Sequence, residues 1–221
     1  MEDDDNNRRI WFQNGPYSGN RITLGPFQWE IVQKLNEHST QRNQAEHDHY
    51  RGTSGASTKL LCRDHRDYAY MRIVQQIPIL NTETTPAVKG SEQAATRYTL
   101  EELDAYQKLT QRGSTNTPKL LAYKVLQQDA SSVLVPNGYL IYLVWELVPG
   151  LRLGAKQGPD PFWDLDRVER DEIRSAFIVG LKALLKIGII SDGAALSSLV
   201  WHKESKTVRT WQLSRLLAWK R

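Results

Sequence analysis

Two short triplets contain side chains that could do chemistry, His47-Asp48-His49 and His65-Arg66-Asp67. Imidazole and carboxylate groups are common metal ligands, but the first triplet lies in a polar stretch without a third ligand at a useful spacing. We therefore predict solvated histidines there and no metal site. The second triplet places a carboxylate beside two basic groups, and its meaning depends on the element that holds it. Cys62, the single cysteine, lies in an apolar stretch and is predicted to be a small core residue.

Composition sets broad limits on the class of protein. The 221 residues have a formal net charge of +4, too mild by itself to indicate a nucleic-acid partner. One cysteine allows no internal disulfide and favours a reducing compartment. The longest apolar run, 139–145, is far too short to span a bilayer, and no signal-peptide pattern opens the chain. We therefore expect an intracellular, soluble protein, cytoplasmic or in another internal compartment.

The C-terminal stretch is basic and rich in tryptophan. Trp201, Trp211 and Trp219 alternate with lysines and arginines, and such residues could stack on bases or lie on an anionic surface. Tryptophans that pack beneath a solvated basic rim explain the same pattern more simply. We therefore keep a polyanion-binding module as one alternative function.

Strand patterns precede the first predicted helix. Residues 1–21 are polar and predicted to form a flexible lead-in, and residues 22–35 a strand or strand pair. A long polar insertion is expected over 36–58, followed by a strand over 60–77 in which apolar residues alternate. Thr99 followed by Glu102 is a capping-box pattern that opens an amphipathic helix ending at Gly113.

The second half of the chain predicts two strands, a long helix and a hairpin. The strands are expected over 118–127 and 138–148, and the nearly continuous apolar run of the latter indicates a buried strand that ends at Pro149-Gly150. The helix spans about 166–187, with Ile173, Phe177, Leu181 and Leu184 facing inward. Leu199 to Trp201 and Thr207 to Leu213 are predicted to pair as a hairpin.

Four segments resemble divergent fungal protein-kinase-like sequences related to phosphotransferases. They are TPKLLAYK (117–124), GYLIYLVWELVPGLRL (138–153), FWDLDRVERDEIRSAF (162–177) and LVWHKESKTV (199–208). The resemblance extends over about 60–213. It implies an α+β, protein-kinase-like fold of two lobes, with a small lobe over 22–148 and a shortened C-terminal lobe over 149–221.

The resemblance implies where a nucleotide would bind. The Val-Ala-Ile-Lys of the kinase small lobe corresponds to Ala69-Tyr70-Met71-Arg72, which places an arginine where a lysine anchors phosphates and a large ring where alanine covers the adenine. Glu102 has the spacing of the glutamate that pairs with this lysine, although its capping box with Thr99 is an equally good explanation. Glu146, before the hinge, is a further nucleotide-binding candidate.

The resemblance also tests the His65-Arg66-Asp67 triplet. In kinases the catalytic His-Arg-Asp follows the hinge and the long helix and has an asparagine five residues after its aspartate. Here the triplet precedes both elements and Arg72 lies at that spacing, so we interpret it as a coincidence.

The corresponding catalytic loop should follow the long helix, where several expected groups are replaced. Aligned on Leu199-Val200-Trp201, the metal-binding asparagine becomes Ser198, the metal-binding aspartate becomes Gln212, and the catalytic aspartate falls on Gly193 or, with one insertion, on Asp192. These replacements remove both protein anchors for Mg²⁺. Kinases also carry a phosphate-binding Gly-x-Gly-x-x-Gly loop before the Val-Ala-Ile-Lys strand. No such loop precedes Ala69-Tyr70-Met71-Arg72 here.

Three functions follow from these residues. A catalytically degenerate, pseudokinase-like domain that binds a protein partner and needs no cofactor is the preferred interpretation. The alternative is a divergent phosphotransferase that uses ATP with Mg²⁺, with Asp192 as base. The basic interaction module is the third, and whether the protein is an enzyme stays open at the level of sequence.

Overall fold

The computed structural model describes residues 9–50, 52–84, 86–95, 98–155, 157–189 and 195–210. The chain forms two compact units. The first contains the residues up to 98 together with 121–144, and the second contains 99–120 together with the residues from 145 onward. The chain therefore passes between the units after residues 98, 120 and 144.

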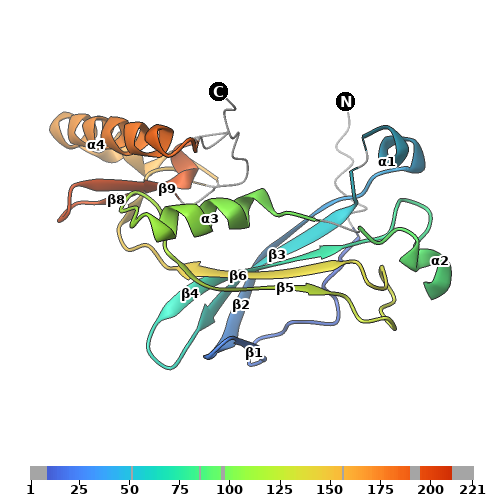
Figure 1. Ribbon diagram of the computed structural model, residues 1–221. Helices are drawn as coiled ribbons and strands as arrows, with labels where there is room; N and C mark the ends of the chain where they lie inside the picture. The colour runs from blue at the N-terminus through green and yellow to red at the C-terminus, as the bar shows by residue number, and fades with distance from the viewer. Residues whose placement is uncertain are drawn as a thin grey trace. The chain divides into compact units, whose positions relative to one another are not determined.

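The first unit is built on an extended sheet. Within the described residues its strands follow the order β1-β2-β3-β4-β6-β5 (Figure 1). They are β1 (Arg21–Leu24), β2 (Phe27–Thr40), β3 (Gly55–Arg63), β4 (Tyr68–Gln76), β5 (Leu120–Gln127) and β6 (Tyr139–Glu146). The strands β1 to β4 form an antiparallel meander. Because β6 lies next to β4, the preceding strand β5 forms the outer edge.

Two sequence expectations about the strands of this unit are wrong. The single strand predicted over 60–77 is a hairpin, because β3 and β4 are joined by a turn at 64–67. The predicted insertion over 36–58 is largely ordered: β2 continues to Thr40, and α1 (Gln44–Tyr50) precedes β3. Polar residues extend β2 because the ladder with β3 depends on backbone groups, while side chains at the end of β2 remain exposed.

The core of the first unit gathers on one face of the sheet. It consists of Trp11, Phe12, Leu24, Trp29, Ile31, Ala56, Leu60, Cys62, Ala69, Met71, Ile73, Ile77 and Val144. Trp11 and Phe12 therefore pack in the core although the sequence placed them in a flexible lead-in. The backbone carbonyl of Trp11 also accepts a hydrogen bond from Gln75 Nε2 at 3.3 Å. Cys62 is fully buried, as expected of a small core residue.

The second unit combines two helices with a small sheet. These are α3 (Glu101–Gln111), α4 (Arg167–Lys186) and the antiparallel strands β7 (Leu151–Arg152), β8 (Leu199–His202) and β9 (Thr207–Thr210). Asp166 caps α4 by accepting a hydrogen bond from the Glu169 N–H at 2.8 Å, and Gly188, with φ of 76°, follows its end. The predicted helix is confirmed, and the predicted hairpin is confirmed as far as Thr210, because residues 211–213 lie outside the described residues.

A second core holds this unit together. It contains Leu153, Phe162, Ile173, Leu199, Trp201 and Val208. Ile173 and Leu184 are buried as predicted for α4, whereas Phe177 and Leu181 are half-buried. The helices and antiparallel strands of the two units confirm the α+β class.

Candidate functional site

Arg72 and Tyr70 lie on one face of β4, opposite the core face. Ala69, Met71 and Ile73 alternate with them and are buried, whereas Tyr70 and Arg72 are half-buried. In the ladder Arg72 is directly opposite Lys59 of β3. The strand therefore presents the predicted phosphate-binding residue beside a second cation.

Lys59 is the functional candidate that the sequence reasoning missed. Lys59 is only 8% exposed, and its Nζ lies 3.9 Å from the centroid of the Tyr70 ring. A cation over a ring face at this distance is stabilised by the ring quadrupole, and more strongly when it is desolvated. The signal in the sequence was a lysine within the otherwise uncharged run GASTKLLC. The Tyr70 ring is therefore held within the unit by Lys59.

Glu102 lies on α3 and is 4% exposed. The predicted capping box is wrong, because the N-cap of α3 is Leu100 and no side chain caps it. Helix α3 instead buries the face that contains Glu102, Leu103, Ala105, Tyr106 and Leu109. Arg72 belongs to the first unit and Glu102 to the second, so their pairing stays a prediction.

Glu146, the third nucleotide-binding candidate, is engaged inside the second unit. Arg209 Nη1 of β9 donates to Glu146 Oε1 at 3.0 Å, and both side chains are 26% exposed. The backbone N–H of Glu146 also donates to the Lys119 carbonyl at 3.0 Å. Through these contacts Glu146 connects the end of β6 to β9. Its role in binding a nucleotide stays a prediction.

The segment after α4 holds the predicted catalytic loop. Ser198 is fully buried in a short turn (Leu196–Ser198), and its hydroxyl donates to the Ala195 carbonyl at 2.7 Å. This hydroxyl is therefore satisfied by its own turn. Asp192, Gly193 and Gln212 lie outside the described residues.

The His65-Arg66-Asp67 triplet forms the turn between β3 and β4. Asp64 Oδ1 accepts the backbone N–H groups of Arg66 and Asp67, each at 2.8 Å. These hydrogen bonds lower the pKa of Asp64, and the bond from the Asp67 N–H has the larger effect. The triplet is thus part of a hairpin turn organised by the residue before it.

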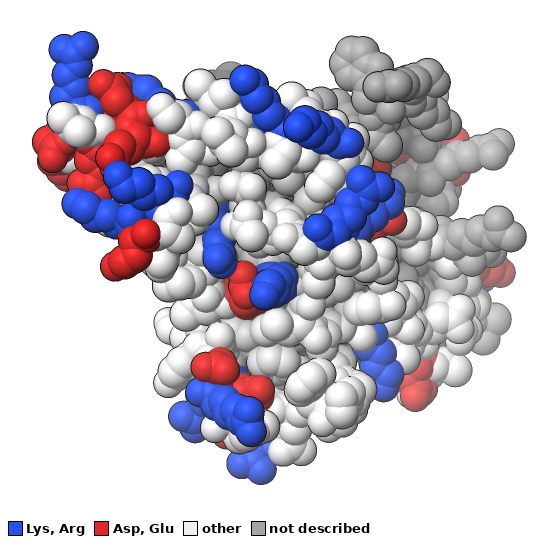
Figure 2. Space-filling model, turned by 60° about the vertical axis from the view of Figure 1, so that its left-hand side comes forward, with Lys and Arg blue, Asp and Glu red and all other residues white. Residues whose placement is uncertain are grey.

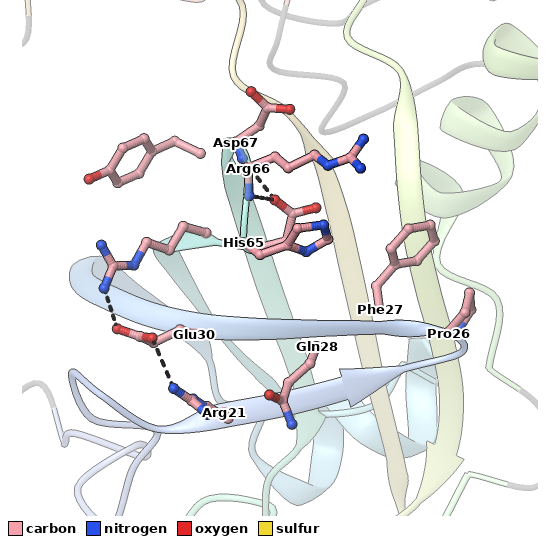
Figure 3. A pocket seen from close by; sticks show the side chains of 11 residues that line it. Arg21, Pro26, Phe27, Gln28, Glu30, His65, Arg66 and Asp67 are labelled. Carbon is pink, nitrogen blue, oxygen red and sulfur yellow. Dashed lines mark hydrogen bonds and ion pairs between the residues drawn. The ribbon is translucent and has the colours of Figure 1, made fainter.

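This turn borders a hollow of about 590 Å³ over the β1–β2 hairpin (Figure 3). Glu30 in its wall accepts a hydrogen bond from Arg63 at 2.8 Å and lies 3.7 Å from Arg21. Acidic and basic groups are both present in the lining, including Arg66 and Asp67. The hollow therefore has no single charge sign that selects a ligand.

The basic C-terminal hairpin is paired with acidic residues of α4. Lys203 Nζ lies 2.9 Å from Glu169 Oε2, and Lys206 Nζ lies 2.6 Å from Glu172 Oε1. Red and blue side chains also lie directly beside one another at the upper left of Figure 2. Trp201 is buried, whereas Trp211 and Trp219 lie outside the described residues. The described lysines of the hairpin are therefore partly neutralised.

Other kinds of site find little support in the described ranges. His47, on α1, has its Nδ1 3.1 Å from the Gly52 carbonyl. Across these ranges no three histidine, cysteine, aspartate or glutamate side chains gather as a possible metal site. Likewise, none of the described helices is long and apolar enough to cross a membrane.

Comparison with solved structures finds protein kinases. The Cydia pomonella granulovirus kinase PK-1 is 14% identical with a TM-score of 0.49, and the match covers 86% of this chain and 53% of that kinase. Vaccinia related kinase 3 is 12% identical with a TM-score of 0.46, covering 93% of this chain and 53% of that kinase. The chain thus spans about half the length of these kinases.

Sequence comparisons find no relatives. No protein-family model matches the chain, and no curated protein matches it. The kinase-like resemblance and its fungal grouping therefore stay predictions from the sequence.

Proposed function

We propose that this chain is a kinase-like domain that acts by binding a protein partner and does not transfer phosphate. The observation that carries this proposal is the state of Ser198. The resemblance gives this position to a metal-binding asparagine, whose side-chain oxygen would face the ion. Here a short hydroxyl is fully buried and bonded to Ala195 at 2.7 Å. A group engaged in this way is a poor ligand for Mg²⁺, which prefers carboxylate and water oxygens.

The Tyr70 side chain supports the same proposal at the base-binding position. The sequence resemblance gives Tyr70 the place of the alanine that covers adenine in kinases, and Lys59 Nζ lies 3.9 Å from the centroid of its ring. Moving the ring to admit a base would give up this contact. The contact between Lys59 and Tyr70 therefore supports the proposal that this position does not accept an adenine.

Several groups that kinases use to bind the metal and the phosphates are replaced together in this chain, and their loss should lower the rate of phosphate transfer more than the loss of one. Removing one electrostatic group typically lowers a rate by about 10²–10³. Ser198, Gln212 and Arg72 would alter the metal and phosphate subsites in the same domain, so one compensating residue such as Asp192 is insufficient. We infer that the kinase-like framework is used as a binding scaffold.

A thermal-shift titration tests this proposal. A ligand that binds the folded state raises its melting temperature. We expect ATP, with and without Mg²⁺ or Mn²⁺, to leave the melting temperature unchanged, while an active kinase measured in parallel shows a shift. An Mg²⁺-dependent shift that disappears in Arg72→Ala, with folding retained, would favour the phosphotransferase. In that case Asp192→Asn should abolish any phosphate transfer while leaving ATP binding in place.

A further inference from the structure

Strand β5 (Leu120–Gln127) presents an apolar outer edge. It pairs with β6 on one side, and no other described strand pairs with its far side. Leu121, Tyr123 and Val125 are 39%, 47% and 53% exposed. The outer edge of a sheet carries backbone donors and acceptors that can pair with a strand of another chain. This edge combines those groups with apolar side chains, so it is suited to strand addition.

The protection of this edge against pairing is weak. Edge strands are usually shielded by lysines, prolines, bulges or a covering element. The sequence of β5, LLAYKVLQ, has one charged residue, Lys124, and no proline. Thr110 of α3 covers its beginning, because its hydroxyl accepts the Leu120 N–H at 2.8 Å. Beyond it Leu121, Tyr123, Val125 and Leu126 are exposed, which leaves this stretch for a partner strand.

We propose that β5 pairs antiparallel with β5 of a second copy of this chain. A two-fold axis perpendicular to the sheet keeps equivalent side chains on the same face, and the axis must pass through one residue pair. The pattern of side chains selects which pair this is.

Charge and shape both favour an axis at Tyr123. An axis at Lys124 would oppose two ammonium groups, and like charges directly opposite one another are destabilising. An axis at Tyr123 opposes two rings, places Leu121 against Val125 of the second copy, and places Lys124 against its Ala122. Aromatic and apolar cross-strand pairs of this kind are stabilising. The strand is therefore self-complementary in this register.

The size of the contact predicts its strength. Stable interfaces bury roughly 1,200–2,000 Å² in total, and a single pair of short strands provides less. The association is therefore concentration-dependent, and each copy remains folded when it is alone.

Cysteine cross-linking tests the register. Opposite residues of an antiparallel pair have Cα atoms about 4.5–5.5 Å apart, within the reach of a disulfide. Tyr123→Cys should therefore form a covalent dimer on mild oxidation. In Leu121→Cys or Val125→Cys, equivalent thiols lie about 13 Å apart along the strands, so neither should cross-link when oxidised separately. A mixture of these two variants should yield the mixed dimer.

The native protein is the control for this experiment. Cys62 is fully buried, and burial raises its pKa to about 12, so its thiol should not react. Equal cross-linking by all three variants would mean random collision and would overturn the proposal. Failure of Tyr123→Cys to cross-link at the highest soluble concentration would overturn it as well.

Sedimentation equilibrium tests the association without a cross-link. The average mass of the native protein should rise toward that of a dimer with concentration. Tyr123→Lys should weaken the association at least about tenfold, because it places ammonium groups opposite each other. Val168→Lys, at a side chain 72% exposed on α4, is the matched control and should associate normally. A native protein that stays monomeric throughout, or equal weakening by both variants with unchanged melting temperatures, would contradict the proposal.

Discussion

The indole Nε1–H of Trp201 donates to Glu169 Oε1 at 2.9 Å and joins strand β8 to the first turn of α4. Lys203 donates to the other oxygen of the same carboxylate, also at 2.9 Å. These two hydrogen bonds lower the pKa of Glu169, and the bond from Lys203 has the larger effect. One carboxylate thus holds a buried indole and an exposed ammonium together.

The first prediction concerns the pH dependence of this contact. A glutamate whose pKa is lower in the folded state stabilises the fold above its unfolded pKa, about 4.3, and this stabilisation is lost as pH falls through the folded value. The melting temperature of Glu169→Gln should therefore lie below that of the native protein at neutral pH, and the gap should shrink as pH falls from about 5 to about 3. Glu172→Gln, which removes a more exposed ion pair with Lys206, should have a smaller effect. An equal gap at both ends of this range would contradict the assignment.

A second prediction ranks positions on α4. Ile173 is buried, and Ile173→Ala should cost about 2–5 kcal/mol of the free energy of unfolding. Phe177 is half-buried beside a small apolar hollow, so Phe177→Ala should cost less than a buried phenylalanine, about 1–3 kcal/mol. Val179, 67% exposed, is the control, and its change to alanine should cost less than about 0.5 kcal/mol. Urea denaturation measures all three, and the reverse order would remove α4 from the core.

A third prediction concerns the close approach of Gly154 to the turn before β8. A Cβ at Gly154 would lie 2.1 Å from the backbone N of Ser197, a contact that requires the backbone to move. Gly154→Ala should therefore destabilise the protein by about 3 kcal/mol or more. At Gly90 in α2 (Ala87–Ser91) the nearest atom would be 3.4 Å away, so Gly90→Ala should be neutral or stabilising. Equal melting temperatures for the two variants would rule out the close approach.

A fourth prediction separates Asp64 from the triplet that follows it. Asp64→Ala removes the acceptor of two backbone hydrogen bonds at the β3–β4 turn and should cost about 1 kcal/mol. Asp67→Asn should change stability by less than about 0.5 kcal/mol, and it should leave any ATP turnover unchanged. Loss of turnover in Asp67→Asn with an unchanged melting temperature would show that the triplet acts in catalysis.

Long elements with a strong local pattern were predictable from the sequence. The 3.6-residue rhythm and Asp166 indicated α4, and a continuous apolar run indicated β6. Local patterns misled where one residue could serve two purposes. Thr99 and Glu102 have capping-box spacing, yet α3 begins one residue later and buries Glu102 on its inner face. Packing of the apolar face outweighed a cap worth about 1 kcal/mol.

The sequence by itself determined the α+β class and the order of most elements. Tertiary structure decided which side chains meet. Lys59 lies opposite Arg72 because of the β3–β4 register, and Arg209 reaches Glu146 across 63 positions of sequence. A slip of one residue in register turns every side chain to the other face of a strand, and register follows from the burial of whole faces. Such pairings therefore depend on the packed core and not on the spacing of residues along the chain.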